Sequence, residues 1–325
     1  MKFDYIKNIL IDPETKNPLK YENNYFASES NKYFVENDII SIYLKDEETD
    51  DTTSLQKEFY EDVMFPNYDD LDDFSSLIEK SEGSMFAKKL DQEIPYSSKV
   101  VEIGCGTGQL SNFLSRYNRV IVGTDLSTNS LKLANDFKKK NSIDNVYFIE
   151  MNLFKPCFQE NTFDVVISNG CLHHTSNPKK AFSSISKLAK SGGYIVIGLY
   201  HKNGRLFTNI RQRLFKMFNN RFKFLDPKNV DSSISESKRY AWFRDQYQNP
   251  KEFSYGFNEI FNWFKDNNIE YLSSIPFHGF DASFKILEKH KKPNKFKIFI
   301  KELMMTFDID QIKEGGFFIM VGKKN

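Results

Sequence analysis

Three glycines at alternate positions mark the first segment whose residue types could do chemistry. Gly104, Gly106 and Gly108 follow the apolar run 100–103 and precede a segment with helical periodicity. Because glycine has no Cβ, such a loop lets a ligand approach the backbone closely. The helix that follows presents free N–H groups at its start. The segment therefore predicts a ligand-binding turn between a strand and a helix.

Two carboxylates beside this loop narrow the kind of ligand. Asp125 ends the next apolar run, where it can accept hydrogen bonds from both ribose hydroxyls of an adenosine. A nicotinamide dinucleotide and S-adenosylmethionine both require that acid. Glu102 favours S-adenosylmethionine, because a carboxylate beside the loop suits an ammonium group and repels a pyrophosphate. Gln109 also stands where a dinucleotide fingerprint has its third glycine.

Residues from about 99 to 199 resemble a class I S-adenosylmethionine-dependent methyltransferase of the ubiquinone/menaquinone-biosynthesis-like type. The likeness rests on the glycine loop 102–110, the turn 125–127, the segment 151–153 and the stretch 168–174, which reads Ser-Asn-Gly-Cys-Leu-His-His. It implies S-adenosyl-L-methionine as the cofactor. The cofactor-binding positions that it implies are Glu102, Gly104, Cys105, Gly106, Gly108, Asp125, Leu126, Asn152, Leu153 and Asn169.

The resemblance also implies a role for several of these positions. The three glycines line the methionine part of the cofactor, and Asp125 holds the ribose. Leu126 packs on the adenine, and Asn152 reaches the adenine amino group, where many relatives have Asp. Asn169 bonds near the cofactor's ammonium group.

The segments around these positions alternate between strand-like and helix-like patterns. Apolar runs at 100–103, 119–125, 145–149, 163–168 and 194–199 are separated by helix-like segments at 110–116, 130–140 and 179–189. Such alternation predicts βαβ units and a doubly wound parallel α/β sheet. The resemblance implies a seven-stranded Rossmann-like sheet with an antiparallel last strand at 316–321, plus a small N-terminal β-rich module and helical insertions.

This pattern divides the chain into three parts. Residues 1–45 resemble the zinc-ribbon-like module of some tRNA and protein methyltransferases, on 11–19 and 33–40. Asp12 stands where that family often has a metal-binding cysteine, and no cysteine precedes Cys105, so no metal is expected. Residues 46–98 are read as an acidic solvated linker, a helix from Ser54 through Val63 and an aromatic lid. Residues 99–325 form the methyltransferase domain, with insertions at about 202–253 and 277–313.

Candidate catalytic and substrate-binding residues follow the strands or precede the domain. A general base assists methyl transfer to a hydroxyl, a protonated amine or a carbon acid. The imidazoles expected near the pocket are His173, His174 and His201. In relatives, the first His of a Leu-His-His turn more often caps and packs the loop. The expected substrate-binding residues are Tyr60, Phe65, Tyr68, Tyr200, Arg205 and Trp242.

Composition excludes some classes of partner and leaves others open. The net charge of +1 excludes a globally basic nucleic-acid binder, yet residues 202–223 carry seven bases and no acid. Between 204 and 219, apolar residues lie on one helical face. Three cysteines without a C-x-x-C pair suit the cytoplasm, and no apolar run is long enough for a transmembrane segment.

The favoured function is methylation of a small-molecule or carrier-linked acceptor, which the basic insertion would suit if the acceptor is anionic. The alternatives are a methyltransferase for tRNA or protein and a non-catalytic adaptor with the same fold. The sequence leaves the acceptor and the oligomeric state open.

Overall fold

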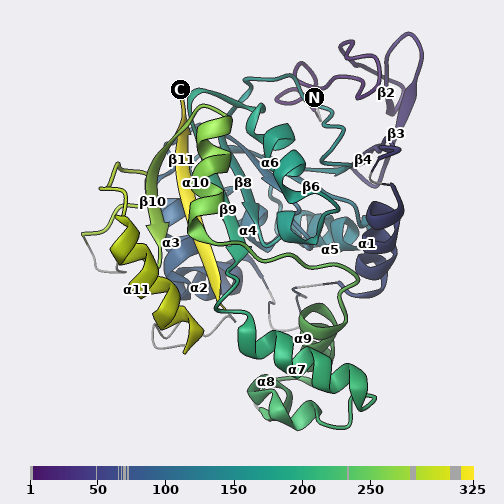
Figure 1. The fold of residues 1–325 in the computed structure, drawn as a ribbon. Coiled ribbons are helices and arrows are strands. Elements are labelled where there is room, and N and C mark those ends of the chain that lie inside the picture. The colour runs from purple at the N-terminus through teal and green to yellow at the C-terminus, as the bar shows by residue number, and fades with distance from the viewer. Residues whose placement is uncertain are drawn as a thin grey trace.

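Short apolar segments form the central strands of one twisted sheet (Figure 1). The computed structural model describes residues 3–48, 50–64, 66, 68, 71, 73–232, 234–278, 283–307 and 316–325. Its strands are β1 (Lys20–Glu22), β2 (Tyr25–Ala27), β3 (Lys32–Glu36), β4 (Ile39–Ile42), β5 (Lys99–Ile103), β6 (Val120–Asp125), β7 (Val146–Met151), β8 (Phe163–Asn169), β9 (Ala189–Tyr200), β10 (Ile269–Ile275) and β11 (Phe317–Lys324). Their order in the sheet is β1-β2-β3-β4-β7-β6-β5-β8-β9-β11-β10.

The seven strands from β7 to β10 in this order are the sheet that the sequence predicts. β7, β6, β5, β8 and β9 are parallel neighbours, whereas β11 runs antiparallel between β9 and β10. The doubly wound α/β fold with an antiparallel last strand is therefore confirmed.

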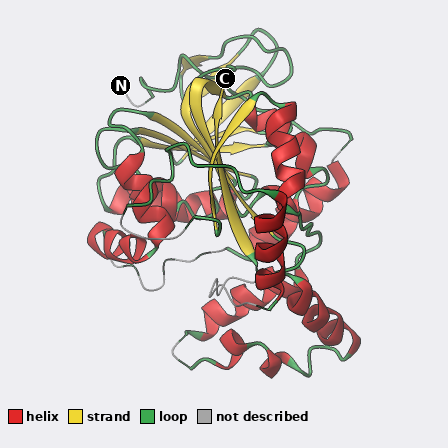
Figure 2. Ribbon diagram, turned by 60° about the vertical axis from the view of Figure 1, so that its left-hand side comes forward, coloured by secondary structure: helices red, strands yellow, loops and turns green. Residues whose placement is uncertain are grey.

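Helices cover both faces of this sheet (Figure 2). The helices of the described residues are α1 (Asp50–Asp62), α2 (Phe74–Gly83), α3 (Met85–Glu93), α4 (Gln109–Phe113), α5 (Thr128–Lys140), η1 (Leu172–His174), α6 (Pro178–Ser186), α7 (Leu206–Met217), η2 (Lys223–Leu225), α8 (Pro227–Val230), α9 (Glu236–Gln248), α10 (Phe257–Asp266) and α11 (Lys295–Thr306). In Figure 1, α6 and α10 lie in front of the sheet, and α2 to α5 lie behind it. Two separate apolar clusters fill these two layers. None of these helices is long and apolar enough to cross a bilayer within the described ranges.

The N-terminal strands extend the central sheet. β4 pairs in parallel with β7, from Ile39 opposite Phe148 to Ile42 opposite Met151. The chain between β7 and β8 forms no helix in the structure, and residues 3–11 pack at that place instead. The Ile11 amide donates to the Cys157 carbonyl at 2.8 Å. The first residues thus share a core with the strands of the central sheet.

The expected solvated linker is wrong at both of its ends. Asp46 is buried, and its carboxylate pairs with Lys155 and Lys180 at 3.4 and 3.2 Å. α1 begins at Asp50 rather than at Ser54. Because two lysines compensate the charge of Asp46, this acid folds against the domain.

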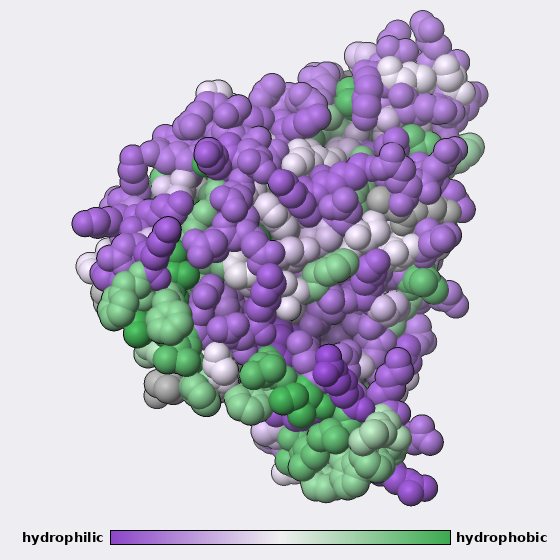
Figure 3. Space-filling view, in the orientation of Figure 1, coloured by the Kyte–Doolittle hydropathy of each residue, from purple (hydrophilic) through white to green (hydrophobic). Residues whose placement is uncertain are grey.

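The two insertions form helices at one end of the molecule. α7, η2, α8 and α9 project below the sheet, and α11 lies beside its β10 edge (Figure 1). Exposed apolar side chains gather over α11 and over α7 and α8 in Figure 3. The apolar face expected within residues 204–219 is therefore largely exposed.

The Asp12 carboxylate organises the turn of the N-terminal module. It accepts hydrogen bonds from the amides of Glu14 and Thr15 and from the side chains of Ser28, Asn31 and Tyr33. Burial alone raises the pKa of this carboxyl, but the hydrogen bonds outweigh it and lower the pKa to about 2 from 3.8. Hydrogen bonds to one acid thus shape this turn, where the related modules often have a metal-binding cysteine. No group of three or more His, Cys, Asp or Glu residues in the described ranges is arranged to hold a metal ion.

Replacing this acceptor should destabilise the chain. We expect Asp12→Asn to lower the free energy of unfolding by about 1–3 kcal/mol at pH 7, the cost of leaving buried donors unmatched. Because the folded pKa is lowered, the contribution of Asp12 is present above pH 4 and is lost as the pH falls toward about 2. Denaturant unfolding at pH 7 and pH 3 measures both effects. The control is Glu14→Gln, at an exposed acceptor of the same turn; equal losses from both variants would contradict the role of Asp12.

Candidate functional site

The glycine loop follows β5 with all three glycines in the left-handed region. Their φ angles are 72° at Gly104, 53° at Gly106 and 70° at Gly108. A Cβ at Gly104 would lie 2.4 Å from Cys171 Sγ, and one at Gly108 would lie 2.7 Å from Phe148. Two of the glycines are thus required by close packing as well as by the backbone.

Asp125 joins this loop to the end of β6. Its carboxylate accepts the Gly106 amide at 2.8 Å and the Ser127 amide at 2.9 Å. Burial raises the pKa of this carboxyl, and the amide hydrogen bonds partly oppose that effect. Asp125 is therefore held by the backbone at the carboxyl end of its strand, where the sequence places it.

A cavity of about 1050 Å³ opens at the carboxyl ends of β5, β6, β7 and β8. Of the ten predicted cofactor positions, all but Gly108 line it: Glu102, Gly104, Cys105, Gly106, Asp125, Leu126, Asn152, Leu153 and Asn169. Gly108 instead lies where α4 begins, against Ala134 and Phe148. Its lack of a side chain lets these elements pack and does not shape the cavity.

Two asparagines of the cavity differ in the hydrogen bonds they have left to make. Asn169 Oδ1 is buried without a partner and would accept a bond from a ligand's ammonium group. Both polar atoms of the Asn152 side chain are hydrogen-bonded: Nδ2 donates to the Leu44 carbonyl, and Oδ1 accepts a hydrogen bond from the Phe154 amide. The cavity thus fits a ligand that carries an ammonium group near Asn169.

Glu102 is a buried acid in the same wall. Burial raises the pKa of its carboxyl to about 8, and the nearby Asp125 adds to this, although Ser111 Oγ donates to it at 2.5 Å. A cation bound beside Glu102 would favour the ionised carboxylate. The acid is thus placed to respond to a positively charged ligand.

The end of α1 contacts the start of α5, and the segment after α1 contacts the glycine loop. Glu61 accepts hydrogen bonds from the amides of Thr128 and Asn129 at the start of α5. Tyr60 lines the cavity. Tyr68 does not line it, because its ring stacks on Phe137 and its hydroxyl donates to the Thr107 carbonyl at 2.8 Å. Phe65 lies outside the described residues.

The three candidate histidines occupy different places. His174 lines the cavity, and its Nδ1 lies 3.1 Å from the Lys251 carbonyl, to which it must donate. This hydrogen bond leaves Nε2 as the acceptor nitrogen. His173 is buried beneath it without a partner, and burial lowers the pKa of its imidazole well below 6.5.

The expectation that His201 faces the pocket is wrong. Its ring stacks on Phe257, and its Nε2 lies 3.3 Å from Glu302, away from the cavity lining. The cause is the path of the chain after β9, where His201 bridges to Tyr255 instead of following the strand end into the pocket.

Residues of the insertion form the far wall of the cavity. Tyr200 and Trp242 line it, as predicted for the substrate side, but Arg205 does not. The Arg205 guanidinium is buried and paired with Glu252 at 2.6 Å, so it supports Tyr200 from behind, 3.9 Å from the ring centroid.

Sequence reasoning missed one acid of this wall. Asp245 lines the cavity and accepts hydrogen bonds from Tyr60 and Gln246. The aromatic segment 242–247 pointed to the region, but no pattern within it distinguishes an inward carboxylate from a solvated one.

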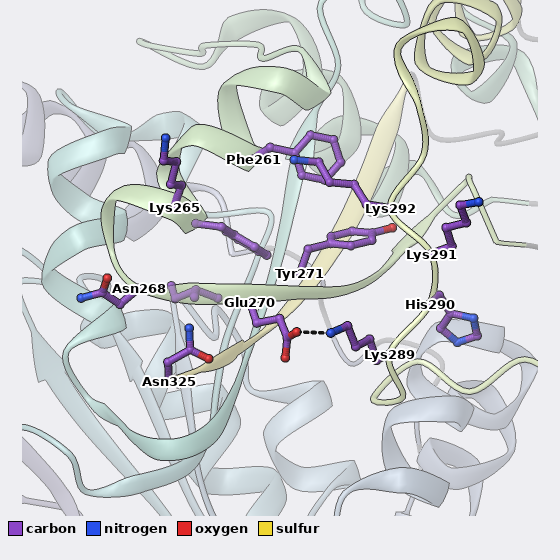
Figure 4. A pocket seen from close by; sticks show the side chains of 12 residues that line it. Phe261, Lys265, Asn268, Glu270, Tyr271, Lys289, His290, Lys291, Lys292 and Asn325 are labelled. Atoms are coloured by element: carbon purple, nitrogen blue, oxygen red, sulfur yellow. Dashed lines mark hydrogen bonds and ion pairs between the residues drawn. The ribbon is translucent and has the colours of Figure 1, made fainter.

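A second cavity of about 540 Å³ lies at the β10 edge of the sheet (Figure 4). No predicted site residue lines it. Glu270 pairs with Lys289 there, and Lys292 lies 4.0 Å from the centroid of the Phe261 ring. These charged groups already have protein partners, whereas the first cavity contains an unmatched acceptor.

Comparisons with known proteins indicate the same class of protein as the residues that line the first cavity. A family described as "Methyltransferase domain" matches residues 101–197. A ubiquinone biosynthesis O-methyltransferase of Glaesserella parasuis is 25% identical over 55% of this chain and 79% of its own length. A malonyl-[acyl-carrier protein] O-methyltransferase of Paenibacillus is 26% identical over 37% of this chain and 44% of its own. The chain spans about half the length of several other curated relatives that it matches.

Solved structures share the fold. PKMT2 from Rickettsia typhi, also solved in complex with AdoHcy, superposes with a TM-score of 0.51 and 17% identity over 74% of this chain and 52% of that one. The strand order, the glycine loop and the family match together define a class I S-adenosylmethionine-dependent methyltransferase domain in this chain. S-Adenosyl-L-methionine is the cofactor of this class.

The buried Glu102 should make the stability of the domain depend on pH. Its folded pKa of about 8 lies above the ordinary 4.5, so the folded state holds the proton more tightly and loses stability as the pH rises from 4.5 toward 8. We expect Glu102→Gln to raise the midpoint of thermal unfolding of the ligand-free protein at pH 8 and to change it little at pH 5. Glu79→Gln, at an exposed position on α2, is the control. A difference independent of pH would contradict the buried titration.

Proposed function

We propose that this chain transfers a methyl group from S-adenosylmethionine to a small-molecule or carrier-linked acceptor that binds against α8 and α9. The unmatched Asn169 oxygen, in a cavity that also holds Asp125 and the glycine loop, is the observation that carries the proposal. The cavity volume of about 1050 Å³ reaches the upper end of the usual range for ligand pockets, which suits a cofactor and a second molecule together.

Charge divides this cavity into two ends. The strand ends contribute the acids Glu102 and Asp125, which suit a ligand with ammonium and sulfonium groups. The insertion contributes the bases Lys228, Lys238 and Arg239 against one acid, Asp245. Lys228 Nζ lies 3.5 Å from the centroid of the Trp242 ring. Cations at the second end favour an acceptor that carries a phosphate or carboxylate group. A carrier-linked acyl chain and a free acidic metabolite both meet this requirement.

The residues between the two ends supply orientation and a base. When bound, S-adenosylmethionine supplies an electrophilic methyl group. His174 Nε2, fixed as the acceptor by the Nδ1 hydrogen bond to Lys251, takes the proton from the acceptor group. Tyr60 and Asp245 lie hydrogen-bonded to each other in the wall and hold the acceptor in place. The α1 segment excludes water from the reacting atoms.

Three free cysteines suit a reducing compartment, so we place this reaction in the cytoplasm.

Removing the ribose-binding acid should weaken cofactor binding. We expect Asp125→Ala to reduce the affinity for S-adenosylhomocysteine by about 1–3 kcal/mol, the scale of a charge-assisted hydrogen bond. Titration calorimetry measures the change. Asp136→Ala, at an exposed site on α5, should leave the affinity unchanged. An unchanged affinity in a folded Asp125→Ala variant would remove Asp125 from the site.

Transfer of label from tritiated cofactor into fractionated cell extract tests the class of acceptor. We expect label in small acidic molecules or on a carrier, and less label with Asp125→Ala at a limiting cofactor concentration. Label in RNA or in bulk protein would contradict the proposed acceptor class, and absence of transfer despite cofactor binding would favour a non-catalytic adaptor.

Variants of His174 and His201 should give different results in the same assay. His174→Ala should lower the rate of label transfer by about 10²–10⁴-fold, the usual contribution of a general base, while the affinity for S-adenosylhomocysteine stays the same. His201→Ala is the matched control, because its imidazole lies away from the cavity. Equal loss of rate in the two variants would contradict the assignment of His174 as the base.

A further inference from the structure

The molecule exposes its large hydrophobic side chains unevenly. In the described part of the chain, 21 such side chains are exposed, and thirteen of them lie within 206–230 and 296–307. We call these thirteen the apolar end: Leu206, Phe207, Ile210, Met217, Phe218, Phe224, Leu225, Val230, Phe296, Phe299, Ile300, Leu303 and Phe307. Concentration of this kind marks an interaction surface rather than scattered surface residues.

The two halves of the apolar end are neighbours. Asn203, just before α7, donates to the Glu302 carbonyl of α11 at 3.2 Å. Figure 3 shows both groups of apolar side chains on the lower side of the molecule. On α11, Phe296, Phe299, Ile300 and Leu303 follow a spacing of i, i+3, i+4 and i+7, so one whole helical stripe faces outward.

Basic side chains accompany this apolar surface. α7 carries Arg211, Arg213 and Lys216 and no acid. α11 carries Lys295, Lys297 and Lys301, and its one acid, Glu302, faces His201. Phenylalanine and leucine side chains flanked by cations on amphipathic helices match the interface of a bilayer with anionic headgroups.

A second copy of the chain fits this surface less well. A twofold-symmetric dimer through the apolar end would bring the same basic helices near each other, because such an interface is built from one patch used twice. Like charges brought together oppose that association. An anionic lipid surface instead attracts the cations and buries the apolar side chains at the same time.

We propose that the apolar end is a docking surface for membranes that contain anionic lipids. α7, α8 and α11 lie along the bilayer, with their apolar side chains at the acyl boundary and their cations among the headgroups. The proposal depends on neither the bound cofactor nor methyl transfer.

Co-sedimentation with vesicles tests the docking surface. We expect the full chain to bind vesicles of phosphatidylcholine with phosphatidylglycerol, and to bind phosphatidylcholine alone more weakly. The doubly substituted Phe299→Ser, Leu303→Ser should weaken binding by about tenfold or more through lost apolar burial. Arg213→Ser with Lys216→Ser should weaken binding only to the anionic vesicles, and added salt should do the same.

Phe34→Ser is the matched control, because Phe34 is an exposed phenylalanine of β3 outside the apolar end. Its binding should equal that of the unsubstituted chain. Absence of binding to anionic vesicles, or equal loss with Phe34→Ser, overturns the proposal. Sedimentation velocity adds a further outcome: a dimer that the α11 variant dissociates, without vesicle binding, would assign the surface to a second copy of the chain. Calorimetric binding of S-adenosylhomocysteine confirms that each variant is folded.

Discussion

The hydrogen bond from the Gly106 amide to the Asp125 carboxylate is the contact on which the site depends. It ties the loop after β5 to the end of β6, two neighbouring parallel strands. Three glycines with positive φ are needed to turn the loop back toward β6. The close packing of Gly104 on Cys171 and of Gly108 on Phe148 then fixes this loop against the turn after β8 and against β7. Four strand ends are thereby held around one cavity.

Features encoded within a few residues could be predicted from the sequence. The apolar runs at 100–103 and 163–168 correspond to β5 and β8, because a strand buried on both faces needs consecutive apolar residues. Asp125 and Asn169 could be placed at the same edge, since parallel strands end on the same side of a sheet. The local order and the right-handed connections between strands predict a pocket at this edge, whereas the cofactor and its binding positions were implied by the resemblance to class I methyltransferases.

Features that depend on distant contacts could not be predicted in the same way. The acidic segment around Asp46 looks solvated until Lys155 and Lys180 are brought beside it by the fold. His201 follows a strand, as His174 does, but its pairing with Tyr255 turns it away from the pocket. The apolar stripe of α11 has the spacing of a buried helix. Spacing defines a face, and only the neighbouring elements decide whether that face is covered.

Several polar groups in or beside the cavity are in unfavourable surroundings in the ligand-free fold. Asn169 Oδ1 has no partner, His173 is buried with neither nitrogen bonded, and Glu102 holds a proton that an exposed acid would release at neutral pH. Each of these raises the free energy of the ligand-free protein. The hydrogen-bonded turn around Asp12 and the continuous sheet from β4 to β7 stabilise the same chain elsewhere. A cationic ligand can donate a hydrogen bond to Asn169 Oδ1, and its charge favours the ionised form of Glu102, so both groups can contribute to its affinity.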